Sequence, residues 1–108
     1  MKGMGDILKQ AQKMQRRMME IQEELEALEV VGEAGGGMVK VTASGKGEIK
    51  ALKINPEAVD AEEVEMLEDT ILAAIGDTME KVRKVAGEKM SAVTGGFPGM
   101  GGKGMPGF

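Results

Sequence analysis

The chain has 108 residues, enough for one domain, and 30% of them are charged while only 2% are aromatic. It contains no His and no Cys, which excludes an imidazole base, a thiol nucleophile, a disulfide framework and the usual zinc sites. Fourteen Lys and Arg against eighteen Asp and Glu give a formal net charge of −4, which at face value disfavours a partner as negative as nucleic acid.

The first predicted element is a long amphipathic helix over residues 6–29. Its apolar residues recur with alternating spacings of four and three, the heptad pattern of a helix that packs against another helix along its length. The β-branched pair Val30 and Val31, followed by Gly32, predicts the end of this helix. The seam consists of Ile7, Ala11, Met14, Met18, Ile21, Leu25 and Leu28.

A small antiparallel sheet is predicted in the middle of the chain. The glycines at 35–37 indicate a turn, and Ser44-Gly45-Lys46-Gly47 predicts a hairpin. Apolar and polar residues alternate between Val39 and Ser44, as in a half-buried strand. A bulge is expected at Ala51-Leu52, where the alternation of the next strand fails. The strands are expected near 30–34, at 39–44 and at 48–54.

A second long helix is predicted after the sheet. Asn55 is expected to cap a short helical turn at 56–59, with Pro56 in its first position. Asp60-Ala61-Glu62-Glu63 resembles a capping box, which starts a helix near residue 61 that runs toward residue 93. Because residues 94–108 contain seven Gly and two Pro, we expect a single domain at 1–93 followed by a disordered tail at 94–108.

These elements predict an α+β fold of the order α-β-β-β-α, with two long helices that project from a three-stranded antiparallel sheet. A chain this short with two long apolar seams has little interior of its own. We therefore expect a homodimer, closed either by the sheet or by the helical seam.

The residue types that the chain lacks exclude several functions. Ser44 and Ser91 lie outside any nucleophile motif, so we expect no catalysis, small-molecule substrate, cofactor or metal. Phe97 and Phe108, the two aromatic residues, fall in the predicted tail and leave no platform on which single-stranded bases stack. No apolar run approaches the roughly 20 residues of a membrane span, and we expect no signal peptide, no membrane partner and a cytoplasmic protein.

The net charge is distributed unevenly along the chain. Residues 1–19 carry a net +4 and residues 81–90 a net +3, whereas residues 20–33 carry −6 and residues 55–80 carry −9. If the first helix runs into the sheet and the last runs out of it, the two basic segments share one projecting tip. This predicts a basic surface suited to a duplex backbone on a chain that is acidic overall.

The basic residues of these two segments are the predicted DNA contacts. Lys9, Lys13 and Arg16 fall opposite the apolar seam, and their place in the first half of the helix opposes the preference of the helix dipole for acids there. A solvated helix face is the alternative interpretation. The predicted contacts are Lys9, Lys13, Arg16, Arg17, Lys81, Arg83, Lys84 and Lys89.

Two other features have a structural interpretation. The acidic residues between Glu57 and Asp69 lack a calcium-loop motif, so we interpret them as a solvated helix start and not as a metal site. Met14 and Met18 lie on the seam, which favours core packing over an adaptable binding groove.

Several short segments together carry a family resemblance over nearly the whole chain. They are Met4-Gly5, Lys9-Gln10-Ala11-Gln12-Lys13-Met14-Gln15, Gly37-Met38-Val39-Lys40-Val41-Thr42, Ile54-Asn55-Pro56-Glu57, Met66-Leu67-Glu68-Asp69 and Lys89-Met90 before a Gly-, Met- and Pro-rich tail. In this order and spacing they resemble the YbaB/EbfC family of bacterial nucleoid-associated proteins.

The resemblance implies a homodimer whose long helices project like tweezers and bind double-stranded DNA in the nucleoid, where it organises the chromosome and influences gene expression. It points to the projecting helices, and so to the eight basic residues, as the contact surface. The alternative is a dimeric helical adaptor that binds other proteins through its heptad seam or its acidic base.

Overall fold

The computed structural model describes residues 2–94, and the side chains of residues 3–93. The α-β-β-β-α order and the two long helices are confirmed. The predicted tail, apart from Thr94, lies outside the described residues. The elements are α1 (Lys2–Ala27), β1 (Glu29–Ala34), β2 (Val39–Ser44), β3 (Ile49–Ile54), the 3-10 helix η1 (Pro56–Ala58) and α2 (Val64–Thr94).

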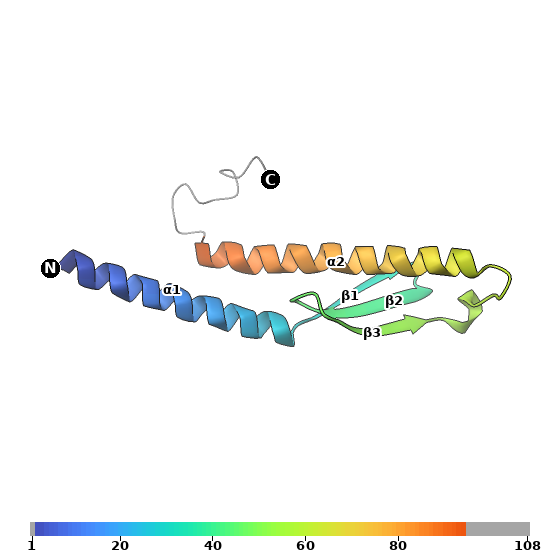
Figure 1. Cartoon of the computed structure of the whole chain (residues 1–108), viewed down its shortest axis with the longest axis horizontal. Helices are drawn as coiled ribbons and strands as arrows, with labels where there is room; N and C mark the ends of the chain where they lie inside the picture. The colour runs from blue at the N-terminus through green and yellow to red at the C-terminus, as the bar shows by residue number, and fades with distance from the viewer. Residues whose placement is uncertain (1, 95–108) are drawn as a thin grey trace, which may run out of the picture.

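The three strands form an antiparallel sheet in the order β1-β2-β3, and α2 lies along one of its faces (Figure 1). The predicted inward residues of β2, Val39, Val41 and Ala43, are fully buried. They contribute to two clusters on the α2 side of the sheet. One cluster contains Val30, Ala43 and Val82, and the other contains Val39, Val41 and Ala74.

A glycine in β1 permits the close approach of α2. A Cβ atom at Gly32 would lie 2.5 Å from the backbone nitrogen and 2.6 Å from the Cα of Thr78, so a larger residue would push the helix away. Thr78 is fully buried, and its Oγ1 donates a hydrogen bond to the Ala74 carbonyl oxygen at 2.7 Å. The helix therefore packs on the sheet without an unpaired hydroxyl at the contact.

The turns agree with the sequence, but the bulge lies one residue away from its expected place. Thr42 pairs with Ala51 while Ala43 pairs with Ile49, so Lys50 is the extra residue and the expected bulge at Ala51-Leu52 is wrong by one position. With Lys50 unpaired, the three large apolar residues of β3 turn toward the α2 side of the sheet. These residues are Ile49, Leu52 and Ile54.

The second helix begins later than predicted. The Asn55 cap is confirmed, since its Oδ1 accepts a hydrogen bond from the backbone N–H of Glu57 at 2.9 Å. Asp60 does not cap α2, because its side chain accepts from the N–H of Glu62 at 2.9 Å and forms a local turn. The helix starts at Val64, three residues after the expected position near 61.

The first helix ends where the β2–β3 turn meets it. The carbonyl oxygen of Leu25 accepts from the N–H of Gly45 at 2.8 Å and from Leu28 at 3.2 Å, so α1 stops at Ala27 instead of the predicted residue 29. The helix also starts at Lys2, before the predicted residue 6. Ile21 and Leu25 are buried near this C-terminal end. Toward its N-terminus the helix extends away from the sheet (Figure 1).

Candidate nucleic-acid interface

Among the described residues, one end of the molecule is formed by α1 alone. Lys89 Nζ of α2 lies 3.0 Å from Glu24 Oε1 of α1, so these two residues are side by side. Only five residues of α2 follow Lys89, whereas 22 residues of α1 precede Glu24. At about 1.5 Å per residue, α1 therefore extends roughly 25 Å beyond α2. We call residues 2–18 the arm. Figure 1 shows the arm continuing past the end of α2.

The arm carries three cations that make no interaction with the rest of the described chain. Lys9, Lys13 and Arg16 are exposed, and within residues 2–94 the structure gives them no hydrogen-bond or ion-pair partner. Their side chains are free to bind an external anion. Because these cations have no existing ion pair, they break none when they contact a phosphate.

A shared carboxylate connects Arg17 of α1 with Lys89 of α2. Glu24 contacts Lys89 at 3.0 Å and Arg17 Nη1 at 3.7 Å, and Arg17 also contacts Glu20 at 3.1 Å. The hydrogen bond and the charge of Lys89 lower the pKa of Glu24, so the carboxylate stays ionised. We call Arg17, Glu24 and Lys89 the clasp.

Lys81 is also paired, with Asp77 of the same helix and with the backbone of β1. Its Nζ lies 3.0 Å from Asp77 Oδ2, and the same oxygen accepts a hydrogen bond from the backbone N–H of Glu33 at 3.0 Å. The bond from Glu33 and then the bond from Lys81 lower the pKa of Asp77. Lys81 also donates to the Val31 carbonyl at 3.5 Å, which places it over β1.

The eight predicted contacts therefore form two groups instead of one tip. Arg83 and Lys84 are exposed on α2, and Lys84 lines a depression of about 470 Å³ together with Lys81 beside the start of β1. The expectation that both basic segments share one tip is wrong, because α2 ends roughly 25 Å short of the start of α1. The arm holds Lys9, Lys13, Arg16 and Arg17, and the body of α2 holds Lys81, Arg83, Lys84 and Lys89.

Two glutamines beside the arm cations, and two lysines on the face of the sheet away from α2, were not among the predicted contacts. Gln12 and Gln15 line a depression of about 370 Å³ with Arg16 on the arm, where their amides are suited to phosphate or base contacts. Lys40 and Lys53 are cross-strand neighbours in the sheet and are both exposed. The charge distribution could not identify the glutamines, because they are uncharged. The sequence could not show that Lys40 and Lys53 are neighbours, because their pairing depends on the bulge at Lys50.

The described residues form neither a metal-binding cluster nor a membrane-spanning helix. Within residues 2–94 there is no group of three Asp and Glu side chains that could hold a metal ion. None of the helices described is long and apolar enough to cross a membrane.

Comparisons with known proteins identify the family and agree with the fold. Residues 1–97 match the YbaB/EbfC DNA-binding family. A nucleoid-associated protein of Rhodospirillum rubrum is 50% identical over 103 residues, which cover 93% of this chain and 96% of that protein. One from Rhodococcus opacus (strain B4) is 45% identical over 105 residues, with coverage of 97% and 93%.

A solved structure has the same fold. The crystal structure of an uncharacterised protein from Helicobacter pylori aligns with a TM-score of 0.65 and 24% identity, and the match covers 79% of this chain and 86% of that one.

Proposed function

Because the chain belongs to the YbaB/EbfC DNA-binding family, we propose that it is a non-enzymatic nucleoid-associated protein that grips double-stranded DNA with the arms of a homodimer. In this role it sits on chromosomal DNA in the cytoplasm, helps to organise the nucleoid and thereby affects transcription. The names of its relatives support the nucleoid assignment.

The observation that carries the proposal is the isolated position of the three unpaired cations. Lys9, Lys13 and Arg16 lie on a helix that extends roughly 25 Å past α2, away from the acidic body. A duplex can contact the arm without approaching residues 55–80, which hold nine acids and no base. The acidic body then limits contact to the arms and prevents broad wrapping, because like charges repel.

Binding of this kind is driven mainly by phosphate contacts. Lys and Arg side chains that neutralise phosphates release counterions, which gives affinity without sequence preference. Direct reading of bases falls to Arg16, Arg17 and the neighbouring glutamines, since arginine and glutamine are the side chains suited to base edges.

An uncovered apolar surface supports the homodimer; we call it the dimer trough, and it consists of Ile49 and Leu52 of β3 and Leu72 of α2. Ile49 and Leu52 point to the α2 side of the sheet, yet each is 49% exposed, because α2 covers β1 and β2 and leaves β3 uncovered. Ile75 of α2 and Ile54 of β3 both pack against the cluster of Val39, Val41 and Ala74. Leu72 of α2, three residues before Ile75 and 66% exposed, lies along the same flank of the helix. A second copy that fills this trough buries the apolar residues of both chains.

The dimer gives the proposed grip its second arm. Two arms present two sets of unpaired cations to the same duplex, so the second contact is intramolecular and strengthens binding. The dimer trough lies on the sheet, at a distance from the arm, so both arms stay free.

A charge-reversal series tests the proposal. The variant Lys13→Glu, Arg16→Glu, Arg17→Glu is titrated against a fluorescently labelled duplex and read by anisotropy. Its matched control is Lys40→Glu, Lys46→Glu, Lys53→Glu, which makes the same change in net charge on the sheet. We expect the arm variant to lose binding while it stays dimeric, and the control to keep most of it.

The adaptor alternative makes the opposite prediction. The exposed part of the heptad seam, including Ile7 at 69% exposure, is the surface through which such an adaptor would bind a partner helix. An adaptor binds with weak salt dependence and loses its partner when Met18 or Leu25 is replaced. Unchanged duplex affinity in the arm variant would favour this alternative.

A further inference from the structure

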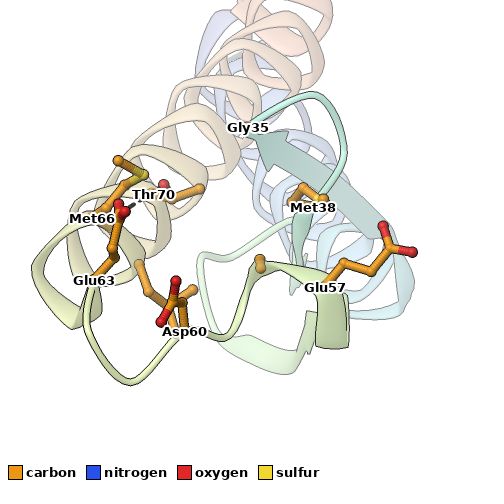
Figure 2. A pocket seen from close by; sticks show the side chains of 9 residues that line it. Gly35, Met38, Glu57, Asp60, Glu63, Met66 and Thr70 are labelled. Atoms are coloured by element: carbon orange, nitrogen blue, oxygen red, sulfur yellow. Dashed lines mark hydrogen bonds between the residues drawn. The ribbon is translucent and has the colours of Figure 1, made fainter.

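A groove lies at the end of the molecule opposite the arm. It has a volume of about 330 Å³ and is formed where η1 and the start of α2 meet the β1–β2 turn. Figure 2 shows Met66 and Thr70 of α2 on one side and Met38 on the other, with Asp60 at the lower edge of the groove. Met66 is 62% exposed, so the groove offers an uncovered apolar surface.

Acidic side chains surround this apolar surface. Glu57, Asp60 and Glu63 line the groove, and within residues 2–94 no Lys or Arg forms an ion pair with any of them. Residues 55–70 as a whole contain seven acids and no base. An occupant of this groove should therefore combine apolar side chains with positive charge.

The arm of the same protein has this combination. Met4, Ile7 and Leu8 follow the spacing of one helix face and are 73%, 69% and 61% exposed. Lys9 and Lys13 lie on the opposite side of the same helical turns, without partners among residues 2–94, so the tip carries apolar and positive side chains on two faces. The arm is thus a cationic helix tip with an exposed apolar face, the type of segment that docks in an acidic, apolar groove.

The arm cannot reach the groove of its own chain. The two features occupy opposite ends of a molecule that extends over 73 Å, and the arm is part of one continuous helix (Figure 1). The groove is also separate from the dimer trough. Its residue Thr70 faces the β1–β2 turn, with Cγ2 3.0 Å from a Cβ built on Gly35, whereas Leu72 lies on the flank next to β3.

We propose that the arm of one molecule docks into the acidic groove of another and joins copies head to tail. Such a contact pairs two different surfaces and leaves a free arm and a free groove, so it extends into longer assemblies instead of closing. The inference builds on the proposed function, because the arm that binds duplex is the same one that fills the groove. DNA and the groove then compete for the arm, and protein not bound to DNA assembles with itself.

The absence of cysteine in the natural sequence allows a direct test by disulfide trapping. Full-length Leu8→Cys and Met66→Cys proteins are oxidised separately and as a mixture, without DNA. We expect a cross-link that is strong in the mixture and weak in either sample alone. A mixture of Leu8→Cys and Glu48→Cys, with the second cysteine outside the groove, is the matched control and should stay uncoupled. Coupling of Leu8→Cys mainly to itself, or none with Met66→Cys, overturns the proposal.

Sedimentation velocity supplies an independent measurement. At about 0.05 M salt we expect species larger than a dimer that disappear at about 0.5 M salt, because screening weakens the charge contact. The variant Glu57→Gln, Glu63→Gln should lose these species, while Glu26→Gln, Glu48→Gln, with the same change in charge, should keep them. Equal behaviour of the two variants contradicts docking in the groove.

Duplex anisotropy of the same variants separates this inference from the proposed function. Glu57→Gln, Glu63→Gln leaves the arm intact, so it should bind duplex at least as tightly as the natural protein. If the trapped contact forms but no duplex is bound, the proposed function fails and the docking stands. If duplex is bound but no contact forms, the docking alone fails.

Discussion

Under the proposed function, Glu24 of the clasp competes with DNA phosphate for Arg17 and Lys89. Its carboxylate holds Lys89 at 3.0 Å and Arg17 at 3.7 Å, so both cations must leave it, or share it, when they contact a duplex. Replacing Glu24 by Gln removes the negative charge and keeps the size of the side chain. We therefore predict that Glu24→Gln strengthens duplex binding.

The size of the effect follows from the contacts of the two cations. Arg17 keeps a second partner, Glu20 at 3.1 Å, whereas Lys89 has no other partner among residues 2–94 and is fully released. One new phosphate contact steepens the slope of log K against log salt by about 0.9, which gives about 1.8 for a dimer. At low salt the two contacts together should raise the affinity roughly fivefold.

The measurement is anisotropy of a labelled duplex at several salt concentrations. Glu23→Gln serves as the matched control, since Glu23 is exposed, adjacent on the same helix and free of partners among residues 2–94. The control changes the net charge equally but releases no cation, so its slope should stay at the natural value. If Glu24→Gln matches this control or binds more weakly, Glu24 orders the helices for binding and does not compete with phosphate.

Three further predictions concern the fold and the dimer. Gly32→Ala forces a Cβ against the Thr78 backbone and should cost about 3 kcal/mol of unfolding free energy in a denaturant titration, whereas Gly76→Ala, in open space, should stabilise α2 by up to about 1 kcal/mol. Leu52→Asp should convert the dimer to monomer by sedimentation, and Val31→Asp, on the other face of the sheet, should not. Folding lowers the pKa of Asp77, so its carboxylate stabilises the folded protein at any pH above the pKa of the unfolded chain. This stabilisation is lost as the pH falls through the lowered pKa of the folded protein. In thermal melts measured against pH, Asp77→Asn should therefore lose less stability in acid than the natural protein does.

Much of the fold could be predicted from periodicity. The alternation in β2 placed Val39, Val41 and Ala43 in the core, and the glycines at 35–37 marked the turn. These predictions succeed because local backbone preference and burial agree. The start of α2 could not be predicted, because the Asp60 side chain accepts a hydrogen bond from the N–H of Glu62 in a local turn and does not cap the helix.

The candidate site was predictable in its charges but not in its arrangement. The sequence identifies Lys9, Lys13 and Arg16 as basic residues opposite an apolar seam. The sequence does not show how far α1 is shifted along α2. That shift depends on the hydrogen bond from the Gly45 N–H, at the β2–β3 turn, to the Leu25 carbonyl oxygen. That contact anchors the end of α1 at the sheet and so helps to set how far the helix extends beyond α2. The pairing of Arg17 and Lys89 with Glu24 depends on the same shift.

The central claim is that the unpaired cations of two arms bind a duplex backbone. Three such cations on each arm give six phosphate contacts for a dimer, and anisotropy of a labelled duplex should show log K falling against log salt with a slope of about −5. A slope near zero, or an unchanged slope after Lys9, Lys13 and Arg16 are all replaced by Gln, would contradict the account.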